Sequence, residues 1–157
     1  KETIHNHSLR FAASEMLPIN EQGLPLGEAS PIRDTIFDFN EAKPIGDVIG
    51  KNDAQVQLAS GGIDHPFILQ GTTIELTEPK SGRVLTIVTD DKALVVYTGS
   101  KIGHGYRFRE APARDFLGIC LEVQNVPNSM KYKHFPSAII KKNERYTKQT
   151  VYRFSVK

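Results

Sequence analysis

The stretch Gly118-Ile119-Cys120-Leu121-Glu122-Val123-Gln124-Asn125, closed by Pro127, predicts the fold class of the chain. Apolar and polar side chains alternate along it, which is the period of a strand with two different faces. A carboxylate in the middle of such a strand costs stability unless it is hydrogen-bonded or lines a polar cleft. Glu122 is therefore the first candidate for chemistry. On the pattern alone, a solvated sheet face is the favoured interpretation, because such alternation is common.

Short strand patterns separated by turn residues fill most of the remaining chain. Residues 78–82 contain Pro79 and Gly82 and predict a hairpin between the strands 73–77 and 83–89. The other expected strands are 4–13, 35–39, 67–69, 94–98, 118–125, 137–140 and 146–156, the last two joined as a hairpin. About nine strands, no long helix and no internal repeat favour an all-β sandwich.

The composition excludes several classes of protein. A chain of 157 residues with 39% hydrophobic and 24% charged residues is long enough for one domain with a core. A net charge of +2 is too small to indicate a nucleic-acid partner, and no apolar run has the length needed to span a membrane. The single cysteine, Cys120, excludes an internal disulfide and favours the cytoplasm.

A second candidate site follows two adjacent glycines in Gly61-Gly62-Ile63-Asp64-His65. A carboxylate accepts up to four hydrogen bonds, so Asp64 is suited to bind hydroxyl groups. The alternative is that Asp64 only caps the turn, which by itself is slightly favoured. The sequence contains no phosphate-binding loop, dinucleotide fingerprint or zinc-ligand spacing.

Seven segments, taken together and in this order, resemble the aldose 1-epimerases (galactose mutarotases). Each motif is weak alone, but the ordered set covers nearly the whole chain and is quite specific. The segments are Leu17-Pro18-Ile19-Asn20 with Leu24-Pro25-Leu26-Gly27-Glu28, Thr35 to Phe39 with Ile45-Gly46, Gly61 to His65, Val96-Tyr97-Thr98-Gly99, Cys120 to Gln124, Phe135-Pro136-Ser137-Ala138-Ile139-Ile140, and Thr150 to Ser155.

The resemblance implies a large antiparallel β-sandwich that binds an aldohexose across a concave sheet. It implies that Glu122 is the catalytic base and that Asp64 hydrogen-bonds sugar hydroxyls. Asp91 lies near a position where relatives carry a sugar-binding Gln or Glu, on a loose match. The implied chemistry is ring opening and reclosure, which interconverts the α and β anomers without a metal or an organic cofactor.

The resemblance also implies a histidine that acts as the acid, and this is the catalytic residue that we do not expect to find within the chain. Asn6-His7-Ser8 copies the first three letters of the family's histidine motif, but Leu9 follows, and the register set by Leu17-Pro18 places His7 on the next strand. We therefore do not assign the acid role to His7. The expectation is that residues 1–157 form a single domain or the C-terminal half of a mutarotase-like sandwich, inactive alone.

A half-sandwich exposes strand edges and an apolar sheet face. The chain is thus expected to pair with a missing N-terminal part or to self-associate. Two other functions remain open. One is a non-catalytic carbohydrate-binding or regulatory module on the same fold. The other, less favoured, is an enzyme for a phosphorylated sugar, with Arg107, Arg109 and Arg114 as candidate ligands.

Overall fold

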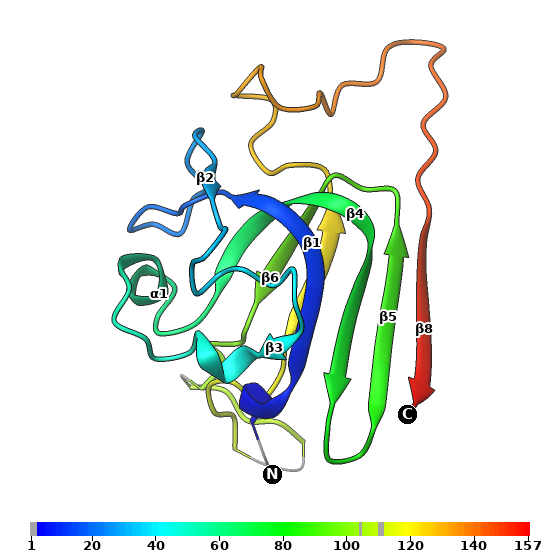
Figure 1. Ribbon diagram of the computed structural model, residues 1–157. Coiled ribbons are helices and arrows are strands. Elements are labelled where there is room, and N and C mark those ends of the chain that lie inside the picture. The colour runs from blue at the N-terminus through cyan, green and yellow to red at the C-terminus, as the bar shows by residue number, and fades with distance from the viewer. Residues whose placement is uncertain (1–2, 104, 110–111) are drawn as a thin grey trace.

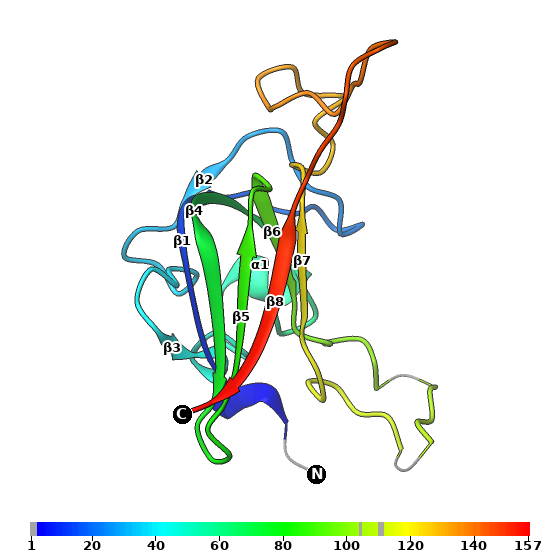
Figure 2. The same ribbon diagram turned by 90° about the vertical axis from the view of Figure 1, so that its right-hand side faces the viewer.

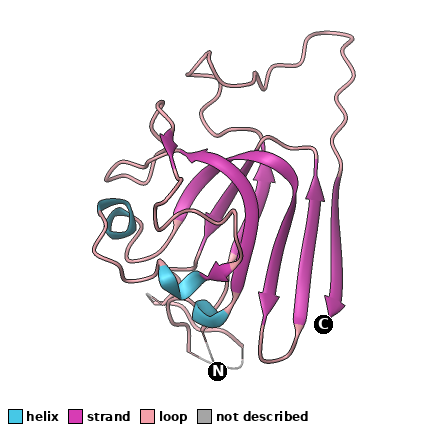
Figure 3. Cartoon of the chain, viewed as in Figure 1, coloured by secondary structure: helices cyan, strands magenta, loops and turns pink. Residues whose placement is uncertain are grey.

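The computed structural model describes residues 3–103, 105–109 and 112–157 (Figure 1). An antiparallel sheet of eight strands dominates it, with only short helices (Figure 3). In chain order the elements are the 3-10 helix η1 (Ile4–Asn6), β1 (Ser8–Met16), β2 (Ser30–Pro31), β3 (Lys43–Pro44), the 3-10 helix η2 (Ile45–Asp47), α1 (Ala54–Leu58), β4 (Asp64–Glu78), β5 (Arg83–Thr89), β6 (Ala93–Tyr97), β7 (Cys120–Gln124) and β8 (Thr150–Val156). The all-β prediction is confirmed.

The sheet is forked, and the long strand β4 carries the fork. One edge of β4 pairs with β1. The other edge pairs with β6 through Asp64–Ile68 and with β5 through Thr73–Glu78. Strand β7 extends the first branch and β8 the second, and in Figure 2 the second branch lies in front of the first. One strand of 15 residues therefore organises the whole sheet.

The core lies on one side of the sheet, between β1, β4 and the segments that contain α1 and η2. Phe11 packs against Phe39 and Phe67, with ring centroids 5.5 and 5.0 Å apart. The buried side chains of the covering segments are Phe39, Ile45 and Val56. Asp53 is the N-cap of helix α1, and its side chain accepts hydrogen bonds from the amides of Gln55 and Val56.

The apolar rows of the core continue beyond the layer that covers them. One row runs across four strands from Leu9 to Phe154, and the next from Phe11 to Tyr152. Leu9 and Phe11 are fully buried, whereas Phe154 is 80% exposed and Tyr152 is 50% exposed. The expected exposed apolar face is thus present at β8.

Two predicted strands are wrong. Residues 35–39 form turns, because the Thr35 hydroxyl donates to the carbonyl of Ile32 and accepts from the amide of Phe37. Phe37 and Phe39 are buried, so the apolar pattern marked core contacts and not a strand.

The hairpin predicted for 137–140 and 146–156 also differs. Residues 137–140 pair with no strand in the described parts of the chain, and only Thr150–Val156 is a strand. A local turn forms instead, in which the amide of Glu144 donates to the carbonyl of Lys141. The predicted strands 67–69 and 73–77 are one strand, β4, and the two-residue strands β2 and β3 were not predicted, so the described sheet has eight strands where about nine were expected. In the described residues, no helix is long and apolar enough to cross a membrane.

Candidate active site

The residues singled out in the sequence meet on the first branch of the sheet, on the face opposite the core. Strand register places three rows of side chains side by side on β4, β6 and β7. The rows are Asp64–Tyr97–Cys120, Pro66–Val95–Glu122 and Ile68–Ala93–Gln124. The intervening residues, among them Phe67, Leu94 and Val123, pack in or against the core. The predicted alternation along β7 is confirmed.

Glu122 stands in the middle row, directly opposite Val95. Its side chain is exposed and makes no hydrogen bond or ion pair within the described part of the chain. Neighbouring strands lie about 4.8 Å apart and successive rows about 6.8 Å apart, so the backbones at Asp64 and Glu122 are about 12 Å apart, with β6 between them. Val95 and Tyr97 of β6 lie between the two carboxylates in the sheet.

The two ends of this face are closed in different ways. A small cluster covers the third row, where Leu17 and Val126 are buried with Ala93, and Phe135 packs against them. At the other end, the hydroxyl of Tyr97 accepts a hydrogen bond of 3.2 Å from the amide of Lys101. The polar residues thus lie between an apolar rim and a loop.

Strand register makes Asp64, Cys120 and Glu122 neighbours on this face, and their charges affect one another. Burial raises the pKa of Asp64, Lys101 opposes this shift, and the charge of Glu122 adds to it. The pKa of the Cys120 thiol is raised by burial and by the charges of Glu122 and Asp64. Two carboxylates on one face with a lysine beside them suit a ligand that presents several hydroxyl groups.

Asp64 is held in place from behind by His65, which points to the core. His65 is fully buried, and its Nδ1 accepts a hydrogen bond of 3.1 Å from the amide of Asp64. Its Nε2 lies 3.0 Å from Oε1 of Gln55 on α1, and therefore donates to it. Burial lowers the pKa of His65 to about 4, partly offset by Asp53, so the ring is neutral at pH 7.

The turn before Asp64 requires glycine. Gly61 has φ +83°, a conformation that other residues rarely adopt. A Cβ on Gly62 would collide with Oγ1 of Thr98 and lie 3.0 Å from the Phe116 ring. The same Thr98 hydroxyl accepts a hydrogen bond from the amide of Ile63, which fixes the start of β4.

Asp91 does not join this group of residues. It follows β5, two residues before the third row, and its Oδ1 lies 3.5 Å from Nζ of Lys148. Its side chain is 11% exposed. A role for Asp91 as a sugar ligand stays a prediction.

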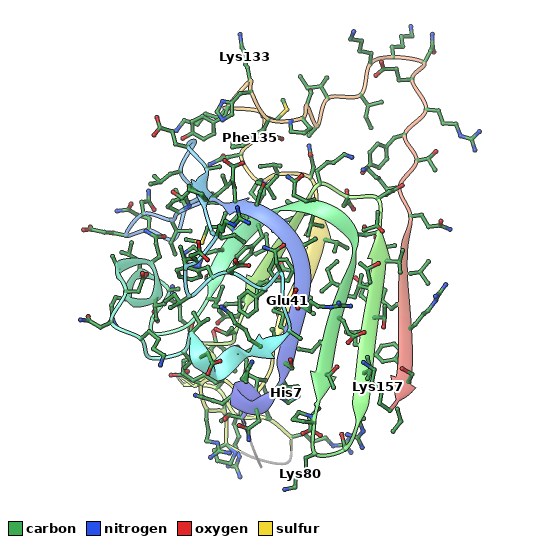
Figure 4. The ribbon with its side chains drawn as sticks, viewed as in Figure 1. His7, Glu41, Lys80, Lys133, Phe135 and Lys157 are labelled. Carbon is green, nitrogen blue, oxygen red and sulfur yellow. The ribbon has the colours of Figure 1, made fainter. Side chains whose placement is uncertain are left out.

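The described histidines do not supply an obvious acid on this face. His65 points to the core, and His134 contacts the carbonyl of Gly27 at 2.8 Å. His7 lies beside the start of β1, at the end of the sheet opposite Phe135 (Figure 4). Tyr97 and Lys101 are additions that sequence reasoning missed. The apolar run of β6 does not alternate with polar residues, so only its pairing with β4 and β7 shows that Tyr97 lies on this face.

The family model for aldose 1-epimerases matches residues 1–153. The chain belongs to the aldose 1-epimerase family. It is 34% identical to the aldose 1-epimerase of Haemophilus influenzae over 158 residues, which cover 96% of this chain and 45% of that enzyme. It is 31% identical to the galactose mutarotase of Sus scrofa over 159 residues, which cover 98% of this chain and 45% of that protein. The chain thus spans about half the length of these relatives.

Solved structures agree with this assignment. The aldose epimerase homologue of C. elegans superposes with a TM-score of 0.86 over 99% of this chain and 47% of that one, at 22% identity, which concerns the fold alone. The galactose 1-epimerase of Lactobacillus acidophilus gives a TM-score of 0.68 at 33% identity, covering 78% of this chain and 36% of that chain. The mutarotase-like fold is therefore confirmed.

Proposed function

We propose that the protein interconverts the α and β anomers of an aldohexose such as glucose or galactose, with Glu122 as the base. The observation that carries this proposal is that Glu122 and Asp64 share one sheet face, with β6 between them. Glu122 takes the proton from the anomeric hydroxyl, and Asp64 accepts hydrogen bonds from other hydroxyls of the sugar. Asp91 is a more distant candidate for contact with the sugar. Its ion pair with Lys148 would have to break before it could bind a hydroxyl.

The reaction needs an acid as well as a base. Ring opening removes the proton of the C1 hydroxyl while the ring oxygen gains one. The open form then rotates about C1–C2 and closes on the other face of the carbonyl. A positioned acid or base contributes about 10²–10⁴-fold each. We infer that a histidine of another polypeptide segment supplies the acid, and that residues 1–157 alone have little or no activity.

The test is polarimetry of anomeric interconversion on the protein assembled with the segment that supplies the acid. Glu122→Gln removes the base, and we expect the rate to fall by about 10²-fold or more. Glu41→Gln is the matched control, because it changes an exposed carboxylate in the loop before β3. A Glu122→Gln protein with the wild-type rate would exclude Glu122 as the base.

The second candidate is a non-catalytic carbohydrate-binding module, favoured by the lack of an obvious acid among the described histidines. Calorimetry separates the two functions. Sugar binding that Asp64→Asn weakens, without any acceleration of mutarotation by the assembled protein, would support the module. The proposed location is the cytoplasm, because the thiol of Cys120 is free and exposed.

A further inference from the structure

Gln55 is a polar side chain on the core side of the sheet that the catalytic proposal does not use. It lies in the first turn of the short helix α1 and is partly buried. Its Oε1 accepts two hydrogen bonds, one of 2.8 Å from the amide of Ile19 and one of 3.0 Å from Nε2 of His65. Its Nε2 donates to the carbonyl of Ile19 at 3.3 Å. One side chain therefore joins three segments that are far apart in the sequence.

The donors and acceptors of this network are determined by its backbone members. A backbone amide only donates, so the Gln55 atom that faces the amide of Ile19 is the oxygen. The same oxygen faces Nε2 of His65, which therefore carries the ring proton and leaves Nδ1 as an acceptor. Nδ1 accepts from the amide of Asp64 at 3.1 Å. The orientation of Gln55 thus determines which nitrogen of His65 is available to Asp64.

The network connects the two ends of the polar sheet face from behind. Asp64 begins β4 at one end of this face. Leu17, two residues before Ile19, is buried in the apolar rim at the other end, and its amide donates to the carbonyl of Pro66 at 2.8 Å. The segment 17–19 is thus tied to β4 twice, once directly at Leu17 and once through Gln55.

The surroundings of His65 favour a fixed geometry. The ring is fully buried and lies beside the ring of Phe37, with centroids 5.4 Å apart. A buried polar group is costly unless it is hydrogen-bonded, and both ring nitrogens of His65 are. A buried network in which every member is satisfied makes the geometry of its members rigid. The network is therefore suited to hold the backbone at Asp64 in one orientation.

We propose that Gln55 and His65 are positioning residues for the sugar site. Gln55 sets the tautomer of His65, and Nδ1 of His65 fixes the backbone from which the carboxylate of Asp64 projects. The carboxylate then meets a sugar hydroxyl without prior reorganisation, which improves binding. This proposal rests on the proposed function, because it assigns the effect of the network to sugar binding.

The experiment compares two substitutions of His65 in the protein assembled with the segment that supplies the acid. His65→Asn places an oxygen near the position of Nδ1 and keeps an acceptor for the amide of Asp64, whereas His65→Gln reaches the position of Nε2 and keeps only the donor to Gln55. Each variant loses one hydrogen bond, so the free energy of unfolding should fall alike in both. A difference between them therefore reports on Asp64.

Hydrogen exchange and calorimetry measure that difference. We expect the amide of Asp64 to exchange about tenfold faster in His65→Gln than in His65→Asn. The affinity for galactose should fall about tenfold in His65→Gln and stay within about threefold of wild type in His65→Asn.

Gln55→Met tests the centre of the network and should speed up exchange at both Ile19 and Asp64. Its matched control is Gln57→Met, which changes an exposed glutamine of the same helix and should leave both amides and the affinity unchanged.

Sugars that lack one hydroxyl separate positioning from a general structural effect. In a series of deoxygalactoses, the one that lacks the partner of Asp64 should bind equally to wild type and Asp64→Asn. His65→Gln should weaken galactose but not this deoxy sugar. A network that only stabilises the fold would weaken every sugar of the series equally, and this result would overturn the proposal.

Two further results would also overturn it, and they differ in what else they exclude. Equal exchange of the Asp64 amide in both His65 variants, with normal sugar binding by wild type, would exclude the positioning role alone. A wild-type protein that binds no sugar of the series would exclude the proposed function and this role together.

Discussion

Asp64 keeps a charge in a place where its solvation is incomplete. Burial is the largest cause of its raised pKa, and the neighbouring charge of Glu122 acts in the same direction. Such a carboxylate is costly to the folded protein and useful to a ligand, because its oxygens accept no hydrogen bond from the described residues. Asp64, the residue proposed to bind the sugar, thus lowers the free energy of unfolding of the chain.

Asp64→Asn should consequently stabilise the chain at neutral pH. Below the ordinary pKa of 3.8 the carboxyl is protonated in both the folded and the unfolded state, so the variant gains nothing. As the pH rises through the raised pKa of the folded state, wild type loses stability and the variant does not. Urea unfolding at pH 3.5 and pH 7 measures the two differences. An equal difference at both values would contradict the assigned burial cost.

His65 gives the opposite pH dependence. Its pKa is about 4 in the folded chain and 6.5 when unperturbed, so its contribution is fully present above pH 6.5 and is lost as the pH falls toward 4. The total loss is about 3 kcal/mol. We expect the free energy of unfolding of His65→Leu to be lower at pH 7 but less dependent on pH in this window. Parallel curves for both proteins would exclude His65 as the source.

At the scale of elements, residue patterns predicted β1, β5, β6, β7 and β8 and the polar face of β7, but they divided β4 into two strands and missed the short strands β2 and β3. Residue patterns also located the β4–β5 hairpin, because its turn chemistry is local. They failed for 35–39, where side-chain hydrogen bonds of Thr35 hold turns, and for 137–140, whose apolar residues have no described strand beside them. The fork at β4 was not predictable. One edge of this strand pairs with both β6 and β5, and a residue pattern does not show which strands pair with an edge.

Gly62→Ala tests the turn that starts β4. The added methyl group would displace Thr98 and the Phe116 ring, and with them the hydrogen bond to Ile63. We expect a loss of about 1–3 kcal/mol in the free energy of unfolding, as for other overpacked sites. Gly118→Ala is the control, because a Cβ there meets no atom within 4 Å. Similar losses in both variants would contradict the proposed collision.

At the scale of the molecule, the family and the fold class were predictable because ordered motifs extend along nearly the whole chain. The candidate site was predictable in part. Glu122 and Asp64 stand in motifs and share a face, whereas Tyr97 and Lys101 join them only through the pairing of β6. Asp91 rests on a loose match, and its contact with Lys148 is not encoded in any local pattern.

The forked strand β4 has a consequence for cooperativity. Its first residue, Asp64, belongs to the proposed sugar face, and its other end carries Leu76, whose row ends at the exposed Phe154 of β8. Both branches hydrogen-bond to this one backbone, so neither can separate from it without unpairing a shared strand. We therefore expect the two branches to unfold together, so that a change which loosens one end of β4 lowers the order of the other.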